Sequence, residues 1–167
     1  MSRFWASIGS LVFFFIAPGG VAGLGPWLVN RWRVRSDFEG LVVLQALGVL
    51  LIGAGFAIVA ECFARFAWQG RGTPAPVAPP DRLVVSGLYR RVRNPMYVGV
   101  TTMVLGQAAL FADPWVALYA VAVWLAFHIF VVIYEEPTLR ASFPQDYAAF
   151  TAVVPRWIPR LRPWRGP

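Results

Sequence analysis

The sequence has no lysine, one histidine and one cysteine among its 167 residues. A single cysteine, Cys62, excludes a disulfide within the chain and a cysteine-rich zinc site, so we expect a small packed residue there and no metal site. Phosphate-binding loops are also missing, because the closely spaced glycines lie inside apolar segments with no strand before them. The arginines are scattered between apolar segments and form no basic stripe, which argues against nucleic acid as a partner.

Charged residues make up only 14% of the chain, whereas hydrophobic residues make up 58% and the mean hydropathy is +0.59. A soluble domain of this length is rarely so apolar. The sequence therefore predicts an integral membrane protein. Its formal charge of +7 favours contact with an anionic membrane face or an anionic ligand.

Four apolar segments approach the roughly 20 residues that a helix needs to cross a bilayer. They are residues 4–29, 38–60, 96–112 and 115–134. Prolines and glycines between Pro18 and Pro26 interrupt the first segment, which predicts either one kinked span or a short helix followed by a re-entrant piece. We favour the kinked span, and we expect it to be retained because no small-residue cleavage site follows the apolar run.

The third and fourth segments are joined only by Asp113 and Pro114, which predicts two adjacent antiparallel helices. Their outer ends then share one side of the membrane, and the larger arginine groups lie on that side. These arginines are Arg65, Arg71, Arg82, Arg90, Arg91, Arg93, Arg140, Arg156, Arg160, Arg162 and Arg165. The positive-inside rule makes this side cytoplasmic. Four plain spans would put Arg31, Arg33 and Arg35 on the other side, so either the larger group outweighs them or the first segment does not cross once.

The segments outside the spans have an interfacial character. Residues 70–80 are rich in proline and predict an extended stretch along the membrane surface. After the last span, Pro137 suits the first turn of a new helix, and apolar residues then recur at helical spacing. These residues are Leu139, Phe143, Tyr147 and Phe150. We expect one short amphipathic helix at the interface, followed by a tail of prolines, tryptophans and arginines.

The predicted architecture is an all-α polytopic membrane bundle of four to five spans, with a C-terminal helical hairpin and the interfacial helix. We treat residues 1–167 as a single membrane domain. Its N-terminal spans lie in residues 1–69, a proline-rich connector in residues 70–86, and the candidate site in residues 87–167.

Residues 87–99 read GLYRRVRNPMYVG and place three arginines and two tyrosines at the entrance of the apolar hairpin. The hairpin closes on two adjacent acids, Glu135 and Glu136. Charged side chains at both outer ends of a membrane hairpin are energetically costly unless they bind a charged ligand. The two clusters therefore predict a site at the bilayer surface.

Other polar residues have simpler interpretations. Arg90 and Arg91 are typical headgroup anchors, while Arg93 is the arginine that we expect in the site. Glu61 is expected to pair with Arg65 one helical turn on, and the intramembrane His128 to pack against a helix partner.

Three motifs in order, GLYRRVRNPMYVG, EEPTLRASFPQDYAAF and VPRWIP, resemble the C-terminal half of a known family. This is the superfamily of isoprenylcysteine carboxyl methyltransferases and phospholipid methyltransferases, which are integral membrane enzymes. The resemblance covers about half the chain, residues 79–159, and is specific for the superfamily rather than for a substrate.

The resemblance implies a cytoplasmic site for S-adenosylmethionine and a lipid-like or isoprenoid-like acceptor that enters from the bilayer. It implies catalytic roles for Arg93, Asn94 and Glu136. The implied cofactor-binding residues are Tyr89, Arg93, Asn94, Pro95, Tyr97, Gly99, Glu135, Glu136 and Leu139. A bacterial inner membrane is the expected location.

The chain departs from the family pattern at a few positions. The family commonly has histidine where this chain has Asn94, glycine at Pro144 and often tyrosine at Phe150. Asparagine keeps a hydrogen bond but takes up no proton near neutral pH, so the site suits positioning of a reactive cofactor better than proton transfer. Two alternatives stay open: a membrane reductase of related fold that uses NADPH, and a non-catalytic lipid-binding protein.

Overall fold

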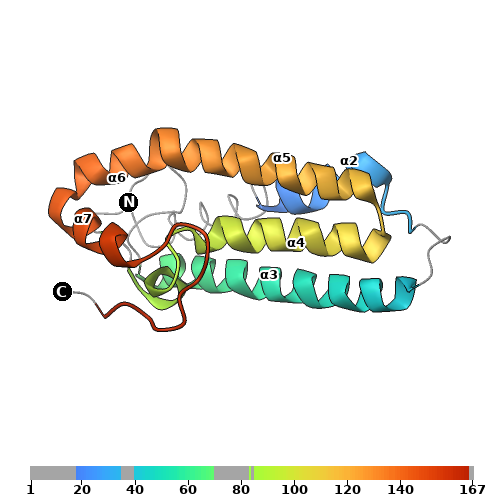
Figure 1. The fold of residues 1–167 in the computed structure, drawn as a ribbon, viewed down its shortest axis with the longest axis horizontal. Helices are drawn as coiled ribbons and strands as arrows, with labels where there is room; N and C mark the ends of the chain where they lie inside the picture. Colours follow the sequence, from blue (N-terminus) through green and yellow to red (C-terminus); the bar gives the residue numbers. More distant parts are fainter. Residues whose placement is uncertain (1–17, 35–39, 70–82, 84, 166–167) are drawn as a thin grey trace.

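The computed structural model describes residues 18–34, 40–69, 83 and 85–165, which form helices and turns and contain no strand (Figure 1). The prediction of an all-α chain is confirmed for this part of the molecule. The elements in chain order are η1 (Gly20–Leu24), α2 (Gly25–Asn30), α3 (Leu41–Gln69), η2 (Gly87–Arg90), α4 (Pro95–Phe111), α5 (Pro114–Phe130), η3 (Val131–Glu135), α6 (Glu136–Ser142) and α7 (Pro144–Val153). Most of the proline-rich connector lies outside the described residues.

The described part of the first apolar segment, residues 18–30, is one continuous helical run. Within it the π-helical turn η1 leads directly into α2, whose first turn contains Pro26. A π turn is a common cause of a bend in a helix. The predicted kinked span also includes residues 4–17, which lie outside the described residues.

Helix α3 runs antiparallel to α4, and glycines bring the two backbones into close contact. A Cβ atom added at Gly48 would lie 2.6 Å from the carbonyl oxygen of Gly106, and one at Gly55 would lie 2.6 Å from that of Gly99. Small residues allow helices in lipid to approach this closely. Gly48 and Gly55 therefore serve the packing of α3 on α4. Gly53 has open space around it and takes no part in the contact.

Helices α4 and α5 form the predicted antiparallel hairpin. Ala112 ends α4 in a left-handed conformation with φ of 52°, and Asp113 caps α5 by accepting a hydrogen bond from the backbone N–H of Trp115 at 2.7 Å. An N-cap carboxylate satisfies one of the free N–H groups of the first helical turn. The turn therefore starts α5 immediately after α4 ends.

The segment η1–α2 packs against both arms of this hairpin. The side chain of Gln107 in α4 donates to the carbonyl oxygen of Ala22 at 2.5 Å, and the hydroxyl of Tyr119 in α5 donates to that of Val21 at 2.9 Å. In Figure 1, α2 lies beside the start of α5, far from α6 and α7. The two ends of the molecule therefore carry different sets of elements.

The region after α5 differs from the prediction of one new helix. The π-helical turn η3 joins α5 to α6 without a break, and α6 and α7 are separate helices that meet at Phe143. Phe143 has φ of −136° and ψ of 63°, outside the helical region. Proline disfavours a helical conformation in the residue before it, so Pro144 ends α6 at this point. The predicted single interfacial helix is therefore wrong.

Two helical stretches within the described residues are long and apolar enough to cross a membrane, Leu41–Arg65 and Pro114–Ser142. Only 17% and 22% of their most apolar windows are buried inside the molecule, whereas the core helix of a soluble protein would be mostly buried. The exposed apolar surface needs a lipid environment. Helix α4 is apolar but shorter, with 17 residues.

Candidate functional site

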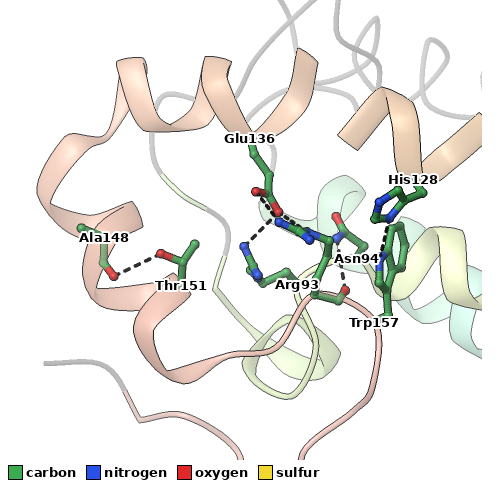
Figure 2. A network of polar contacts seen from close by, with 8 residues as sticks. Arg93, Asn94, His128, Glu136, Ala148, Thr151 and Trp157 are labelled. Carbon is green, nitrogen blue, oxygen red and sulfur yellow. Dashed lines mark hydrogen bonds and ion pairs between the residues drawn. The ribbon is translucent and has the colours of Figure 1, made fainter. Parts of the chain in front are cut away.

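Three parts of the chain meet at the end of the molecule opposite α2. They are the residues just before α4, the α5–α6 junction, and the C-terminal segment Pro155–Trp164, which we call the strap. Figure 2 shows Glu136 pointing from α6 toward the guanidinium of Arg93. Asn94, which precedes α4, and Trp157, which belongs to the strap, lie nearby. The charged residues at the two outer ends of the predicted hairpin thus lie together, as the sequence predicted.

An ion-pair cluster of two arginines around one carboxylate forms the centre of this region. Nη1 of Arg93 donates to Oε1 of Glu136 at 2.9 Å. Arg156 donates from Nε to Oε1 at 2.6 Å and from Nη2 to Oε2 at 2.9 Å. The side chains of Arg93 and Glu136 are only 15% and 11% exposed. Both oxygens of Glu136 are therefore engaged by guanidinium groups in a largely desolvated setting.

The neighbouring acid, Glu135, has a different partner. Its Oε2 accepts a hydrogen bond from the hydroxyl of Tyr97 in α4 at 2.8 Å. The ring of Tyr97 also contacts Phe127 of α5, with 4.7 Å between ring centroids. Glu135 ends the π turn η3 and Glu136 begins α6, so the two carboxylates point to different partners. π turns inside long helices occur frequently at functional sites.

The strap is held against the residues that precede α4 by backbone hydrogen bonds. The N–H of Arg93 donates to the carbonyl oxygen of Pro155 at 2.9 Å, and the N–H of Arg160 donates to that of Arg91 at 2.9 Å. Farther along, the N–H of Trp164 donates to the carbonyl oxygen of Arg90 at 2.8 Å. The strap thereby carries Arg156 to Glu136.

Side chains of the arginine-rich stretch fasten the strap as well. Arg91 donates from Nη1 to the carbonyl oxygen of Leu161 at 2.6 Å, and Nε of Arg90 donates to that of Trp164. Arg90 and Arg91, predicted as headgroup anchors, therefore use their guanidinium groups on the strap. Among the three arginines of the stretch, Arg93 is the one that pairs with the acid.

Asn94, which is 7% exposed, also acts on the strap. Its Nδ2 donates to the carbonyl oxygen of Arg156 at 3.2 Å. An asparagine amide makes such a bond without any change of protonation. Asn94 therefore fixes the backbone at the residue that supplies the second guanidinium.

Four other predicted site residues face different surroundings. Gly99 packs against Gly55 and Val59 of α3, and Pro95 is buried in the first turn of α4. Leu139 packs on the small apolar cluster of α7. Tyr89 lies against Cys62 of α3, and burial raises the pKa of its phenol well above the ordinary value. Gly99, Pro95 and Leu139 therefore pack away from the ion-pair cluster, whereas Tyr89 lies within electrostatic range of Glu135 and Tyr97.

Arg156 of the ion-pair cluster and Tyr147 beside it were not among the predicted site residues. Arg156 lies in the VPRWIP motif, and its hydrogen bonds to Glu136 raise its pKa. Tyr147 of α7 is buried, and burial followed by the negative charge of Glu136 raises the pKa of its phenol. Tyr147 recurs at helical spacing in the sequence, which marked it only as an apolar-face residue.

Polar residues predicted to be structural mostly behave as expected. Nε of Arg65 pairs with Glu61, and Cys62 is fully buried. The ring of His128 stacks on that of Trp124 in the same helix, with 5.4 Å between centroids, and its Nδ1 accepts a hydrogen bond from Nε1 of Trp157 in the strap at 3.1 Å. An indole nitrogen only donates, so Nδ1 is the acceptor and the proton of the neutral ring resides on Nε2.

The guanidinium and carboxylate groups of this region fit a ligand that carries both a negative and a positive charge. Nε of Arg93 is buried and makes no hydrogen bond within the described part of the chain, so it retains a free donor. Glu135, which accepts a hydrogen bond from Tyr97, directly precedes Glu136 and adds a second carboxylate to this end of the molecule, and the ring of Phe127 contacts that of Tyr97. No group of three metal-ligating side chains occurs among the described residues.

A sequence model of the phospholipid methyltransferase family matches residues 43–146, more than half of the chain. The chain belongs to this family, and it is a membrane protein of a methyltransferase class. The match includes nearly all of α3, the whole of α4 and α5, and both acids of the site. The resemblance seen in the sequence motifs is therefore confirmed.

Individual relatives agree in part with this assignment. The chain is 32% identical over 79 residues to protein-S-isoprenylcysteine O-methyltransferase B of Arabidopsis thaliana, covering 47% of this chain and 40% of that protein. It is 26% identical over 172 residues to the cobalt-zinc-cadmium resistance protein CzcN of Cupriavidus metallidurans, covering 90% of this chain and 76% of that one. A probable potassium transport system protein Kup 2 of Rhizobium etli is 27% identical over 172 residues, with 97% of this chain and 25% of that protein covered. The chain thus spans less than half the length of the Arabidopsis and Rhizobium proteins.

Proposed function

We propose that the protein is a membrane methyltransferase that uses S-adenosylmethionine and acts on a lipid-like or isoprenoid-like acceptor. Membership of the methyltransferase family supports the reaction class. The main support for the location of the site is the largely buried cluster of Arg93, Glu136 and Arg156 at the outer end of the α4–α5 hairpin. When bound, S-adenosylmethionine supplies a methyl group on a sulfonium, so the protein needs no covalent nucleophile.

The arginines of the cluster bind the cofactor carboxylate in this proposal. Arg93 has a free Nε donor, and guanidinium groups bind carboxylates through charge-assisted hydrogen bonds. Glu136 acts through them, because its two oxygens hold Arg93 and Arg156 in place. Asn94 contributes by fixing the strap that carries Arg156.

Glu135 and Tyr97 provide the complementary surroundings for the positive groups of the cofactor. A buried carboxylate attracts an ammonium, and an aromatic face attracts a sulfonium by about 0.5 to 2 kcal/mol. Tyr89, Pro95, Gly99 and Leu139, the other residues implied by the family resemblance, are assigned a supporting role. They hold η2, α4 and α6 in register around the cluster.

The acceptor reaches this site from the bilayer. The lipid side of α5 is apolar and exposed, with Leu125 46% and Ile129 55% exposed on the approach to the acids. An acceptor with an apolar tail is concentrated at this surface, and alignment in a site that excludes water supplies rate acceleration. We place the site on the cytoplasmic side of a bacterial inner membrane, within a single domain of four to five spans.

Isothermal titration calorimetry of S-adenosylmethionine against the detergent-purified chain tests the cofactor assignment. Glu136→Gln and Arg93→Ala are expected to abolish measurable binding, while Arg162→Ala, which changes an exposed strap arginine, leaves the affinity unchanged. Normal affinity in both site variants would contradict the proposal. NADPH in a parallel thermal-shift series addresses the reductase alternative, since a ligand stabilises the state that binds it.

Transfer of a radiolabelled methyl group tests the acceptor class. A total membrane lipid extract is expected to become labelled, while a water-soluble analogue without an apolar tail is not. Equal labelling of a tailless acceptor would contradict entry from the bilayer.

A further inference from the structure

A basic turn lies at the opposite end of the molecule from the Arg93–Glu136 cluster. Residues 31–34 follow α2, which lies beside the start of α5 in Figure 1. The side chain of Asn30 donates from Nδ2 to Oδ2 of Asp113 in the α4–α5 turn at 3.1 Å. This hydrogen bond fixes the basic turn to the end of the hairpin.

The turn has a defined shape that directs its side chains outward. Arg31 and Trp32 both adopt left-handed backbone conformations, with φ of 56° and 55°, which residues with a side chain rarely adopt. Nδ2 of Asn30 also donates to the carbonyl oxygen of Arg33 at 2.9 Å, which closes the turn. The guanidinium of Arg31 lies 4.1 Å from the ring centroid of Trp27. A turn held at both sides keeps Arg31 and Arg33 close together.

These two arginines lack a carboxylate partner within the described part of the chain. Both side chains are exposed, and Asp113, the acid of the adjoining turn, is used by Asn30 and by the backbone N–H of Trp115. Two positive charges at this end oppose the positive-inside rule, which favours arginines at the other end. Such placement is unfavourable unless negative charge at the membrane surface compensates for it.

The surroundings of the two arginines suit a lipid rather than a free ion. Trp32 is 53% exposed and Trp115 is 66% exposed, and tryptophan rings favour the headgroup level of a bilayer. Leu28, 58% exposed on α2, continues the apolar surface below them. Acyl chains therefore have a surface to contact directly beneath the charges.

We propose that Arg31 and Arg33 bind the phosphate of an anionic phospholipid in the leaflet opposite the methyltransferase site. Trp32 and Trp115 flank the headgroup, and the acyl chains lie along α2. The ligand class is set by the two guanidinium groups, which have no carboxylate partner among the described residues and can bind phosphate oxygens through charge-assisted hydrogen bonds. This inference does not depend on the cofactor or the acceptor.

Native mass spectrometry of the full chain in a neutral detergent, titrated with short-chain phosphatidylglycerol or phosphatidylcholine, tests the proposal. Arg31→Gln/Arg33→Gln is expected to weaken phosphatidylglycerol binding about thirty-fold, since each interfacial arginine accounts for about a five-fold preference. Arg162→Gln/Arg165→Gln removes the same charge from the strap end and is expected to weaken phosphatidylglycerol binding less than the turn variant does.

A single variant guards against misfolding of the double variant. The guanidinium of Arg33 makes no hydrogen bond or ion pair within the described residues, so Arg33→Gln should fold normally and weaken binding about five-fold. Unchanged binding in Arg33→Gln, or an equal loss in the strap control, overturns the proposal. Competition by glycerol phosphate as strong as that of the lipid would also overturn it, by indicating a site for free phosphate.

Discussion

The two adjacent acids of the site should contribute very differently to stability. Glu136 accepts three hydrogen bonds from two arginines, whereas Glu135 accepts one from the hydroxyl of Tyr97. Glu136→Gln leaves Arg93 and Arg156 with an uncompensated pair of positive charges. Glu135→Gln retains an amide oxygen that still accepts from Tyr97. The same chemical change at neighbouring positions is therefore a matched comparison.

The magnitudes follow from burial and bond number. Removing one partner of a buried ion pair costs about 3 to 5 kcal/mol, and the 31% exposure of the Arg156 side chain favours the lower end, about 3 kcal/mol. Weakening the single hydrogen bond that Tyr97 donates to Glu135 costs about 1 kcal/mol. For a chain of this size these losses correspond to melting temperatures lower by roughly 6 to 12 °C for Glu136→Gln and about 2 to 4 °C for Glu135→Gln.

Thermal unfolding followed by circular dichroism in one fixed detergent measures both variants. A double-mutant cycle adds Arg156→Gln, which should couple to Glu136→Gln by about 2 kcal/mol, while the exposed Arg162→Gln should not couple. A Glu135 variant that is as destabilised as the Glu136 variant would refute the assignment of the two acids. So would an absence of coupling between Glu136 and Arg156.

Two further perturbations address the helix contact and the strap. Gly106→Ala should destabilise the protein by about 2 kcal/mol, because its Cβ would lie 2.8 Å from backbone atoms of α3. Gly53→Ala, which adds a methyl group in open space, should leave the stability unchanged. Chemical denaturation measures both variants, and equal effects would contradict the packing of α3 on α4. Trp157→Phe removes the hydrogen bond to His128 and should lower the free energy of unfolding by about 1 kcal/mol. In ¹⁵N NMR spectra, the ring of this single histidine should change from one tautomer to a mixture of two. An unchanged spectrum would contradict the hydrogen bond.

Much of the fold was predictable because it depends on local sequence. Long apolar runs indicated α3 and α5, and Asp113 with Pro114 indicated the hairpin turn. The proximity of Arg93 to the acids followed from that hairpin, since antiparallel helices bring their outer ends together. The sequence also contains a signal for the break between α6 and α7, because Pro144 disfavours a helical conformation at Phe143. The helical spacing of the apolar residues across this point nevertheless led to the prediction of one continuous helix.

The role of Arg156 was not predictable from local pattern. Its position depends on backbone pairing between the strap and residues 90–93, far apart in the sequence, and no periodicity records such pairing. The π turn η3 likewise leaves no pattern in a uniformly apolar segment, although it sets the directions of Glu135 and Glu136. Long-range pairing and helix irregularity therefore account for what the sequence interpretation missed.

The asparagine at position 94 connects these observations. The amide of Asn94 donates to the Arg156 carbonyl and does not titrate in the physiological pH range. Asn94, Arg90 and Arg91 all fasten the strap, which in turn holds Arg156 on Glu136. These contacts favour the assembled arginine pair without a titrating group at position 94. Such an assembly suits a site that binds and orients a charged cofactor, and it assigns proton transfer no role at Asn94.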